Sequence, residues 1–163
     1  MILNSRRTFL KTAFLGSAVL VMSANSLFGA VLPMHTIEMA QDDLFGHAKK
    51  LGVKSDLYMS IILNHSRVSS TEKEFLRNGA QWLNEEAVLL HGKMYADLSS
   101  GVRQNLLKRI SLSKWGEEWI YTILTYTMEA IFSDEVYGVN KNRTGDKWLD
   151  FEAGFPRPKE AYL

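Results

Sequence analysis

The sequence predicts an all-α protein: a single small helical domain with an irregular, aromatic-rich C-terminal tail, preceded by a signal peptide. Apolar residues recur at helical spacing from about residue 42 to residue 132, and no segment alternates as a strand does. After Phe132 the chain becomes rich in Gly, Pro, Asn and Asp. With 163 residues, 46% of them hydrophobic and 23% charged, the chain can build one core. We expect residues 1–26 to be the signal, 27–40 a linker and 41–163 the helical domain.

The N-terminus has the layout of an export signal. Ser5-Arg6-Arg7-Thr8-Phe9-Leu10-Lys11 precedes an uncharged apolar stretch, 12–22, and then a short run of small polar residues. This pattern resembles the bacterial twin-arginine signal, whose key positions fall on Arg6, Arg7, Phe9, Leu10 and Lys11. The resemblance implies transport of an already folded cargo by the twin-arginine translocase.

Two fates of this segment stay open. Ala24-Asn25-Ser26 offers small residues at the spacing that signal cleavage requires. Alternatively, the segment is kept as an uncleaved anchor, because no charge interrupts residues 12–37. Its polar residues and Pro33 make it a poor spanning helix against the ~20 apolar residues that a bilayer requires.

The first half of the domain is expected to hold three helices. After a loop containing Pro33, a short helix begins at Asp42 and Asp43 and ends before Gly52. A second helix covers about 55–64 and buries Leu57, Ile61 and Ile62. A longer third helix starts at a capping box, Thr71-Glu72-Lys73-Glu74, and buries the apolar series Phe75, Leu76, Ala80, Leu83, Ala87 and Leu90.

Two more helices complete the predicted domain. The fourth begins at Ser99 or Ser100 and ends near Ile110, with cationic residues in its last turn. Ser113 caps the fifth, which runs to about Phe132. We expect this last helix to be buried on several sides, because its apolar residues cover most of its circumference: Trp115, Trp119, Ile120, Ile123, Leu124, Tyr126, Ala130 and Ile131.

Composition excludes several functions. The only charged side chains before Glu38 are Arg6, Arg7 and Lys11. Without these three of the 19 basic residues, 16 basic residues face 18 acidic ones, a formal charge of −2, which argues against nucleic-acid binding. No cysteine is present for a disulfide, a thiolate zinc site, an iron–sulfur cluster or haem c attachment. The four histidines are scattered and no phosphate-gripping glycine loop occurs, so we expect no metal site and no catalytic residue.

The C-terminal third carries the most specific pattern. Its residues are, in order, Trp119, Thr127, Phe132-Ser133-Asp134, Val136-Tyr137-Gly138, Asn140, Gly145, Trp148 and Gly154-Phe155-Pro156. This pattern resembles that of the gluconate 2-dehydrogenase subunit 3 family, in which a helix runs into "F-x-S-D-P-x-Y-G-G-N", a tryptophan and "G-F-P-x-P". Glu135 and Val139 depart from the family's proline and second glycine, and Val139 cannot freely take the positive φ that glycine takes. Two residues also separate Gly145 from Trp148.

The resemblance implies an accessory, non-catalytic small subunit of a periplasmic, membrane-associated sugar-acid dehydrogenase. A large FAD-containing subunit would oxidise gluconate at C2 and a cytochrome c subunit would carry haem c, while this chain binds no cofactor and supports export and assembly. On this hypothesis the partner interface comprises Trp119, Tyr137, Gly138, Asn140, Trp148, Phe155 and Pro156.

Alternatives remain at this point. The tail aromatics Tyr137, Trp148 and Phe155 either fold back onto the domain or dock on a partner. The chain could also be a free-standing periplasmic helical domain that binds a small ligand or acts as a chaperone for an unrelated exported enzyme. A small enzyme in its own right would need a nucleophile or metal constellation, and the sequence shows none.

Overall fold

The computed structural model describes residues 25–152 and 154–161. The chain divides into two units, residues 1–32 and 33–163, and the account below concerns the second. Residues 1–24 of the predicted signal peptide, with Arg6, Arg7, Phe9, Leu10 and Lys11, lie outside the described residues, whereas Asn25 and Ser26 are described as helix. Among the helices that the structure describes, none combines the length and apolar character needed to cross a bilayer.

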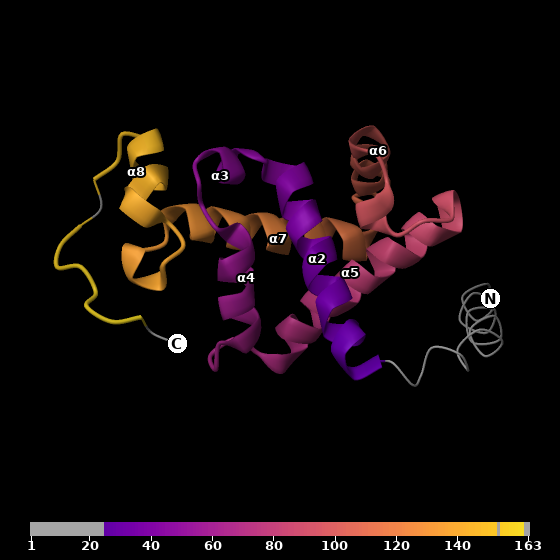
Figure 1. Ribbon diagram of the computed structural model, residues 1–163, viewed down its shortest axis with the longest axis horizontal. Coiled ribbons are helices and arrows are strands. Elements are labelled where there is room, and N and C mark those ends of the chain that lie inside the picture. The colour runs from indigo at the N-terminus through magenta and orange to yellow at the C-terminus, as the bar shows by residue number, and fades with distance from the viewer. Residues whose placement is uncertain (1–24, 153, 162–163) are drawn as a thin grey trace. The chain divides into compact units, whose positions relative to one another are not determined.

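The described chain is helical and contains no strand, as the sequence predicts (Figure 1). Its α-helices are α2 (Asn25–Phe45), α3 (His47–Lys50), α4 (Ser55–Asn64), α5 (Ser70–His91), α6 (Ser100–Ile110), α7 (Lys114–Phe132) and α8 (Thr144–Trp148). Three 3₁₀ turns join them: η2 (Tyr95–Asp97), η3 (Glu135–Tyr137) and η4 (Lys141–Arg143).

The largest difference from the sequence prediction lies in α2. We expected a linker over 27–40 with Pro33 in a loop, but Pro33 lies inside a continuous helix. Proline removes one backbone donor from a helix, and burial elsewhere along the helix can offset that loss. Ile37 and Ala40 of α2 have no exposed surface, so tertiary packing stabilises a helix that local propensity disfavours.

The pair Asp42 and Asp43 was also misread as a helix start. Both lie near the C-terminal end of α2, where acidic side chains are disfavoured by the helix dipole. Each carboxylate has a cationic partner instead: Lys49 Nζ lies 2.6 Å from Asp42, and Arg103 Nε lies 2.6 Å from Asp43. The predicted short helix is reduced to α3, which ends before Gly52 at φ +74°.

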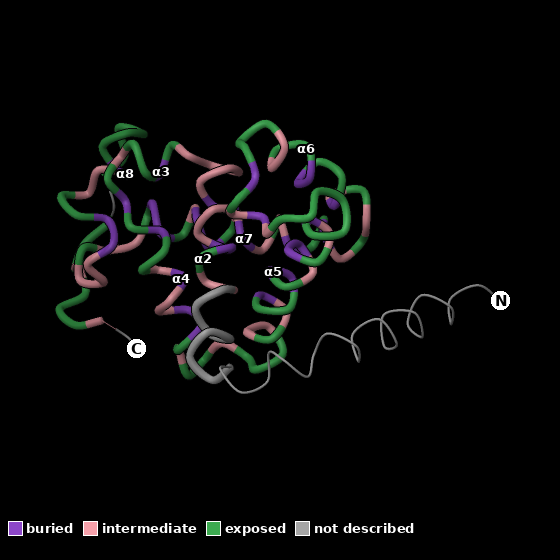
Figure 2. Tube along the Cα trace, turned by 45° about the vertical axis from the view of Figure 1, so that its right-hand side comes forward, coloured by how far each residue is buried: buried purple, intermediate pink, exposed green. Residues whose placement is uncertain are grey.

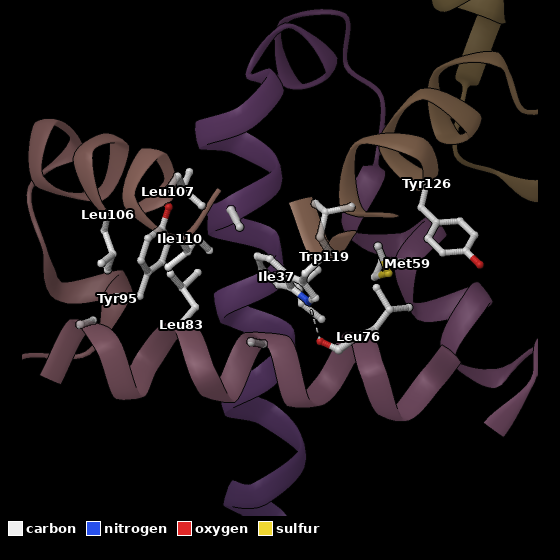
Figure 3. Packing of buried hydrophobic residues seen from close by; sticks show 14 of the residues in the cluster. Ile37, Met59, Leu76, Leu83, Tyr95, Leu106, Leu107, Ile110, Trp119 and Tyr126 are labelled. Atoms are coloured by element: carbon white, nitrogen blue, oxygen red, sulfur yellow. Dashed lines mark hydrogen bonds between the residues drawn. The ribbon is translucent and has the colours of Figure 1, made fainter. Parts of the chain in front are cut away.

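The core is built around α5 and α7, which pack against each other. Helix α7 also contacts α4, α6 and α8. Buried residues recur along both α5 and α7 (Figure 2). Trp119 of α7 is fully buried and its Nε1–H donates a hydrogen bond to the carbonyl oxygen of Leu76 in α5, at 3.0 Å (Figure 3). Trp119 is therefore a core residue of the domain.

Serine side chains cap the two helices α5 and α7, and the cap of α5 differs from the predicted one. Ser113 Oγ accepts a hydrogen bond from Gly116 N at 3.2 Å, as predicted for α7. For α5 the cap is Ser69, whose Oγ accepts from Glu72 N at 3.1 Å, whereas Thr71 lies inside the helix. Ser69 and Glu72 are three residues apart, as Thr71 and Glu74 of the predicted box are. The structure uses the earlier pair at the start of the helix.

Two predicted core leucines are exposed. Leu57 is 39% exposed because it lies on the opposite side of α4 from Met59, which is fully buried. Leu90 is 41% exposed because burial along α5 ends at Ala87. The helix α4 itself ends at Asn64, where the sequence predicts.

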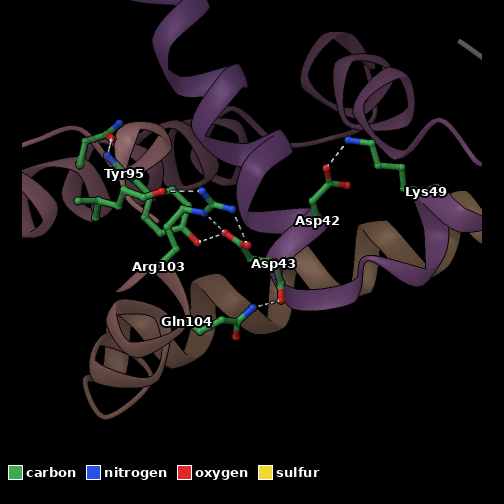
Figure 4. A network of polar contacts seen from close by, with 8 residues as sticks. Asp42, Asp43, Lys49, Tyr95, Arg103 and Gln104 are labelled. Carbon is green, nitrogen blue, oxygen red and sulfur yellow. Dashed lines mark hydrogen bonds and ion pairs between the residues drawn. The ribbon is translucent and has the colours of Figure 1, made fainter. Parts of the chain in front are cut away.

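A polar network fastens α6 to the end of α2 (Figure 4). The Arg103 guanidinium donates to both oxygens of Asp43, at 2.6 Å and 3.0 Å, and the Tyr95 hydroxyl donates to the same carboxylate at 2.8 Å. Burial, reinforced by this hydrogen bond to a carboxylate, raises the pKa of Tyr95 far above its ordinary value. Gln104 Nε2 donates to the backbone carbonyl of Asp43 at 2.6 Å. The network is structural, because its groups are satisfied by one another.

Candidate partner-binding surface

The residues that follow α7 form a hydrogen-bonded module, residues 133–150, organised by Asn140. This side chain has no exposed surface. Its Nδ2 donates to the carbonyl oxygen of Ser133 at 3.1 Å, and its Oδ1 accepts from Gly145 N at 3.1 Å. Asn140 thereby joins the end of α7 to the start of α8, and it explains why an amide side chain is needed at this position of the motif.

The motif glycines have different physical roles. Gly145 packs so closely on α7 that a β-carbon there would overlap the backbone carbonyl of Ile131. Gly138 takes the left-handed conformation, with φ +70°. Val139, at the family's second glycine, is fully buried in a cluster with Ile131 and does not have a positive φ. The module therefore accommodates valine at this position, and its non-glycine residues with positive φ are Asn142, Arg143 and Asp150, at 56°, 53° and 52°.

Ion pairs connect the module to the end of the chain. Arg157 Nη1 donates to Asp134 Oδ2 at 2.8 Å, and Arg157 Nη2 lies 3.8 Å from Asp146 Oδ2. Arg143 Nε donates to the same Asp146 oxygen at 2.7 Å. The hydrogen bond from Arg157 holds the pKa of Asp134 below its ordinary value, and the backbone N–H of Val136 adds to the effect.

Arg157 is a functional candidate that the sequence interpretation missed. The motif pointed to the proline-flanked segment but not to the arginine between the prolines, because its two aspartate partners lie 23 and 11 residues earlier in the chain. The one sequence feature that could have indicated its role is the position of Arg157 between two prolines, after a segment that contains Asp134 and Asp146.

Aromatic side chains of this region are only partly covered. The Trp148 ring lies 4.9 Å from the His47 ring and 6.1 Å from the Phe45 ring, centroid to centroid, yet Trp148 is 39% exposed. Phe155 is 74% exposed and Pro156 is exposed as well. One side of the Trp148 ring thus packs against Phe45 and His47, and the other side is open to solvent. Most of the Phe155 side chain is open to solvent.

Two predicted interface residues are corrected by the structure. Trp119 and Asn140 have no exposed surface, so neither can touch a partner directly in this conformation. They were misassigned because a motif residue that builds the fold and one that makes a contact look alike in sequence. Tyr137 and Gly138 are half-buried, and with Trp148, Phe155 and Pro156 they remain predicted contacts.

The final segment, residues 154–161, is weakly held. Among the described residues, its side-chain hydrogen bond to the module is that of Arg157 to Asp134, at 2.8 Å. Six of its eight residues are exposed.

Other chemistry-bearing groups are dispersed. His35 and Glu38 share one turn of α2 and lie 3.6 Å apart, an H-x-x-E spacing, but both are about half exposed. Within residues 25–152 and 154–161, no three histidine, aspartate or glutamate side chains converge as a metal site would require.

These features define a class: a small all-α domain whose aromatic side chains gather beside a hydrogen-bonded C-terminal module, the kind of surface that other proteins contact. Comparison with family models then gives a match over residues 34–154 to the family described as gluconate 2-dehydrogenase subunit 3. The chain belongs to this family. Searches of curated proteins and of solved structures returned no match.

Proposed function

We propose that this chain is the accessory, non-catalytic small subunit of a flavin-dependent gluconate 2-dehydrogenase, or of a related sugar-acid dehydrogenase, in the periplasm. The observation that carries the proposal is the family match over residues 34–154, which makes the chain one subunit of a gluconate dehydrogenase complex. The twin-arginine pattern at Arg6 and Arg7 supports the export role.

In this proposal the chain carries the flavin subunit across the membrane and then binds it in the complex. A flavoprotein that acquires FAD in the cytoplasm cannot be threaded unfolded across the membrane, so it crosses bound to a folded partner that owns the signal. The FAD of the large subunit supplies the oxidation, and haem c of a cytochrome subunit passes electrons onward toward the membrane. The complex keeps this chain at the periplasmic face of the cytoplasmic membrane, and Trp148 and Phe155 supply its contacts.

The test is the location of the flavin subunit. The chain and the flavin subunit are co-expressed, and the Arg6→Lys/Arg7→Lys double variant is compared with wild type by periplasmic and cytoplasmic fractionation. We expect the flavin subunit to stay in the cytoplasm with the variant. The matched control is Arg67→Lys/Arg77→Lys, two equally conservative changes in the domain, away from the signal. Normal periplasmic flavin subunit with the signal variant would contradict the carrier role.

A second measurement tests the complex itself. Purification of the wild-type chain from membranes should recover a flavin protein and a haem protein in fixed ratio. Recovery of the chain with neither protein would contradict the accessory role and favour a free-standing helical domain.

A further inference from the structure

The final segment, residues 154–161, has the form of a peptide rather than of a domain element. Among the described residues, no backbone hydrogen bond joins it to the rest of the chain. Pro156 and Pro158 fix φ at two positions, and Figure 1 shows the segment as coil beyond α8. Its residues are exposed except Arg157 and Ala161, which are partly buried. Protein grooves recognise proline-containing segments whose backbone groups are free, because proline restricts the unbound backbone.

Arg157 is the point at which this segment is fastened. Its guanidinium donates to Asp134 and lies 3.8 Å from Asp146. Its Nη2 is buried and has no hydrogen-bond partner among the described residues. The guanidinium carbon also lies 5.8 Å from the centre of the Phe155 ring. Arg157 therefore positions Phe155, two residues earlier, while leaving that ring open to solvent.

We propose that residues 154–161 are a docking peptide, bound by a groove on a protein partner, with Phe155 as its anchor and Arg157 as the residue that pre-positions it. The inference rests on the proposed function, which makes the flavin subunit that partner. The exposure of the Phe155 side chain supports it, because burying this ring in a partner removes apolar surface from water.

A protein groove fits the segment better than a lipid surface does. Residues 154–161 carry two basic side chains, Arg157 and Lys159, and one acidic side chain, Glu160. Arg157 is already paired with Asp134, and an anionic membrane attracts clusters of roughly four or more basic residues, which this segment lacks. A protein groove can form hydrogen bonds with the free backbone groups of the segment and bury its one aromatic ring, Phe155.

The experiment measures affinity for the co-expressed flavin subunit. We expect Phe155→Ala to weaken binding at least tenfold without changing thermal stability, because the ring is exposed in the isolated chain. Arg157→Gln should weaken it less, through lost pre-positioning. The matched control is Leu112→Ala, which removes an apolar side chain that is 87% exposed and lies outside this region.

Hydrogen exchange and binding together distinguish failure of the docking-peptide proposal from failure of the proposed function. Backbone amides of 154–161 should exchange quickly in the full chain alone and become protected in the complex. A stable complex in which Phe155→Ala binds as tightly as wild type, or in which these amides stay unprotected, would overturn the docking peptide and leave the proposed function standing. Absence of any complex with wild type would instead contradict the proposed function. Phe155-dependent binding to phosphatidylglycerol vesicles would overturn the choice of a protein groove.

Discussion

Gly79 of α5 lies directly against the indole ring of Trp119 of α7, so closely that a β-carbon at position 79 would overlap the ring atoms. One turn earlier, the carbonyl oxygen of Leu76 accepts the indole N–H. A glycine in mid-helix lowers helix propensity, and here that loss is matched by the close approach of the two helices. The pair sets the spacing of α5 and α7, and therefore the position of everything that follows α7.

The first prediction tests this contact. Gly79→Ala should destabilise the domain by about 1–3 kcal/mol, because the added methyl group overpacks the interface with Trp119. Gly101→Ala is the control, since a β-carbon there meets no atom within 4 Å and alanine has the higher helix propensity. Urea denaturation followed by circular dichroism measures both. Equal stability of the two variants would show that Gly79 does not set the helix spacing.

The second prediction concerns the buried pair of Arg103 and Asp43. Arg103→Met leaves the Asp43 carboxylate inside with only Tyr95 as a side-chain donor, and we expect a loss of about 3 kcal/mol. Lys49→Met breaks the ion pair to Asp42. Because the Lys49 side chain is 72% exposed, we expect this change to lower the free energy of unfolding by less than about 1 kcal/mol. Chemical denaturation gives both values. A larger effect at Lys49 than at Arg103 would be inconsistent with a structural role for the network in Figure 4.

The third prediction concerns the C-terminal module. Gly145→Ala should displace α8 from α7, because the new methyl group would overlap the carbonyl of Ile131. We expect faster hydrogen exchange in residues 133–150 and weaker binding of the flavin subunit. Gly154→Ala, where a β-carbon meets nothing, should leave exchange in the module unchanged. If Gly145→Ala leaves exchange and binding as in wild type, the module does not depend on this close approach.

The fourth prediction is a pH dependence from Asp134. Its folded-state pKa is lowered chiefly by the Arg157 hydrogen bond, so the carboxylate contributes stability above its unfolded pKa of about 4. That contribution is lost as pH falls through the lower folded-state pKa. Asp134→Asn keeps an acceptor for Val136 N but removes the charge. The variant should therefore be less stable near neutrality and converge with wild type in acid, as measured by urea denaturation from pH 7 to pH 3.

The contrasting control for that series is Asp150→Asn, at an exposed carboxylate. Its denaturation curves should follow those of wild type at each pH. If Asp134→Asn also tracks wild type over the whole range, Arg157 does not stabilise the Asp134 carboxylate, and the pre-positioning proposed for the final segment loses its main contact.

Much of the helical framework could be predicted from residue pattern. Ser113 and Gly52 mark helix boundaries in the structure much as they do in the sequence, because capping depends on a few adjacent residues. Ser99 also precedes its helix, but its side chain makes no capping hydrogen bond. Pro33 misled the prediction for the opposite reason. Local propensity at Pro33 favours a break, and only the burial of Ile37 and Ala40 against other helices overrides it.

The candidate surface was less accessible to sequence reasoning. The motif pointed to the correct region, but it did not separate Asn140, which builds the module from inside, from Phe155, which faces solvent. Arg157 was missed because its partners, Asp134 and Asp146, are distant in sequence. Pairing across such separations depends on how α7 and α8 pack.

The sequence by itself determined the helical class, most helix boundaries and the family resemblance, since these depend on periodicity, caps and short motifs within a few residues of one another. Only the tertiary structure decided that α2 continues through Pro33, that Trp119 belongs to the core and that Arg157 fastens the end of the chain. Those outcomes depend on burial and on charge pairing between segments far apart in the chain, and neither exists until the helices have packed.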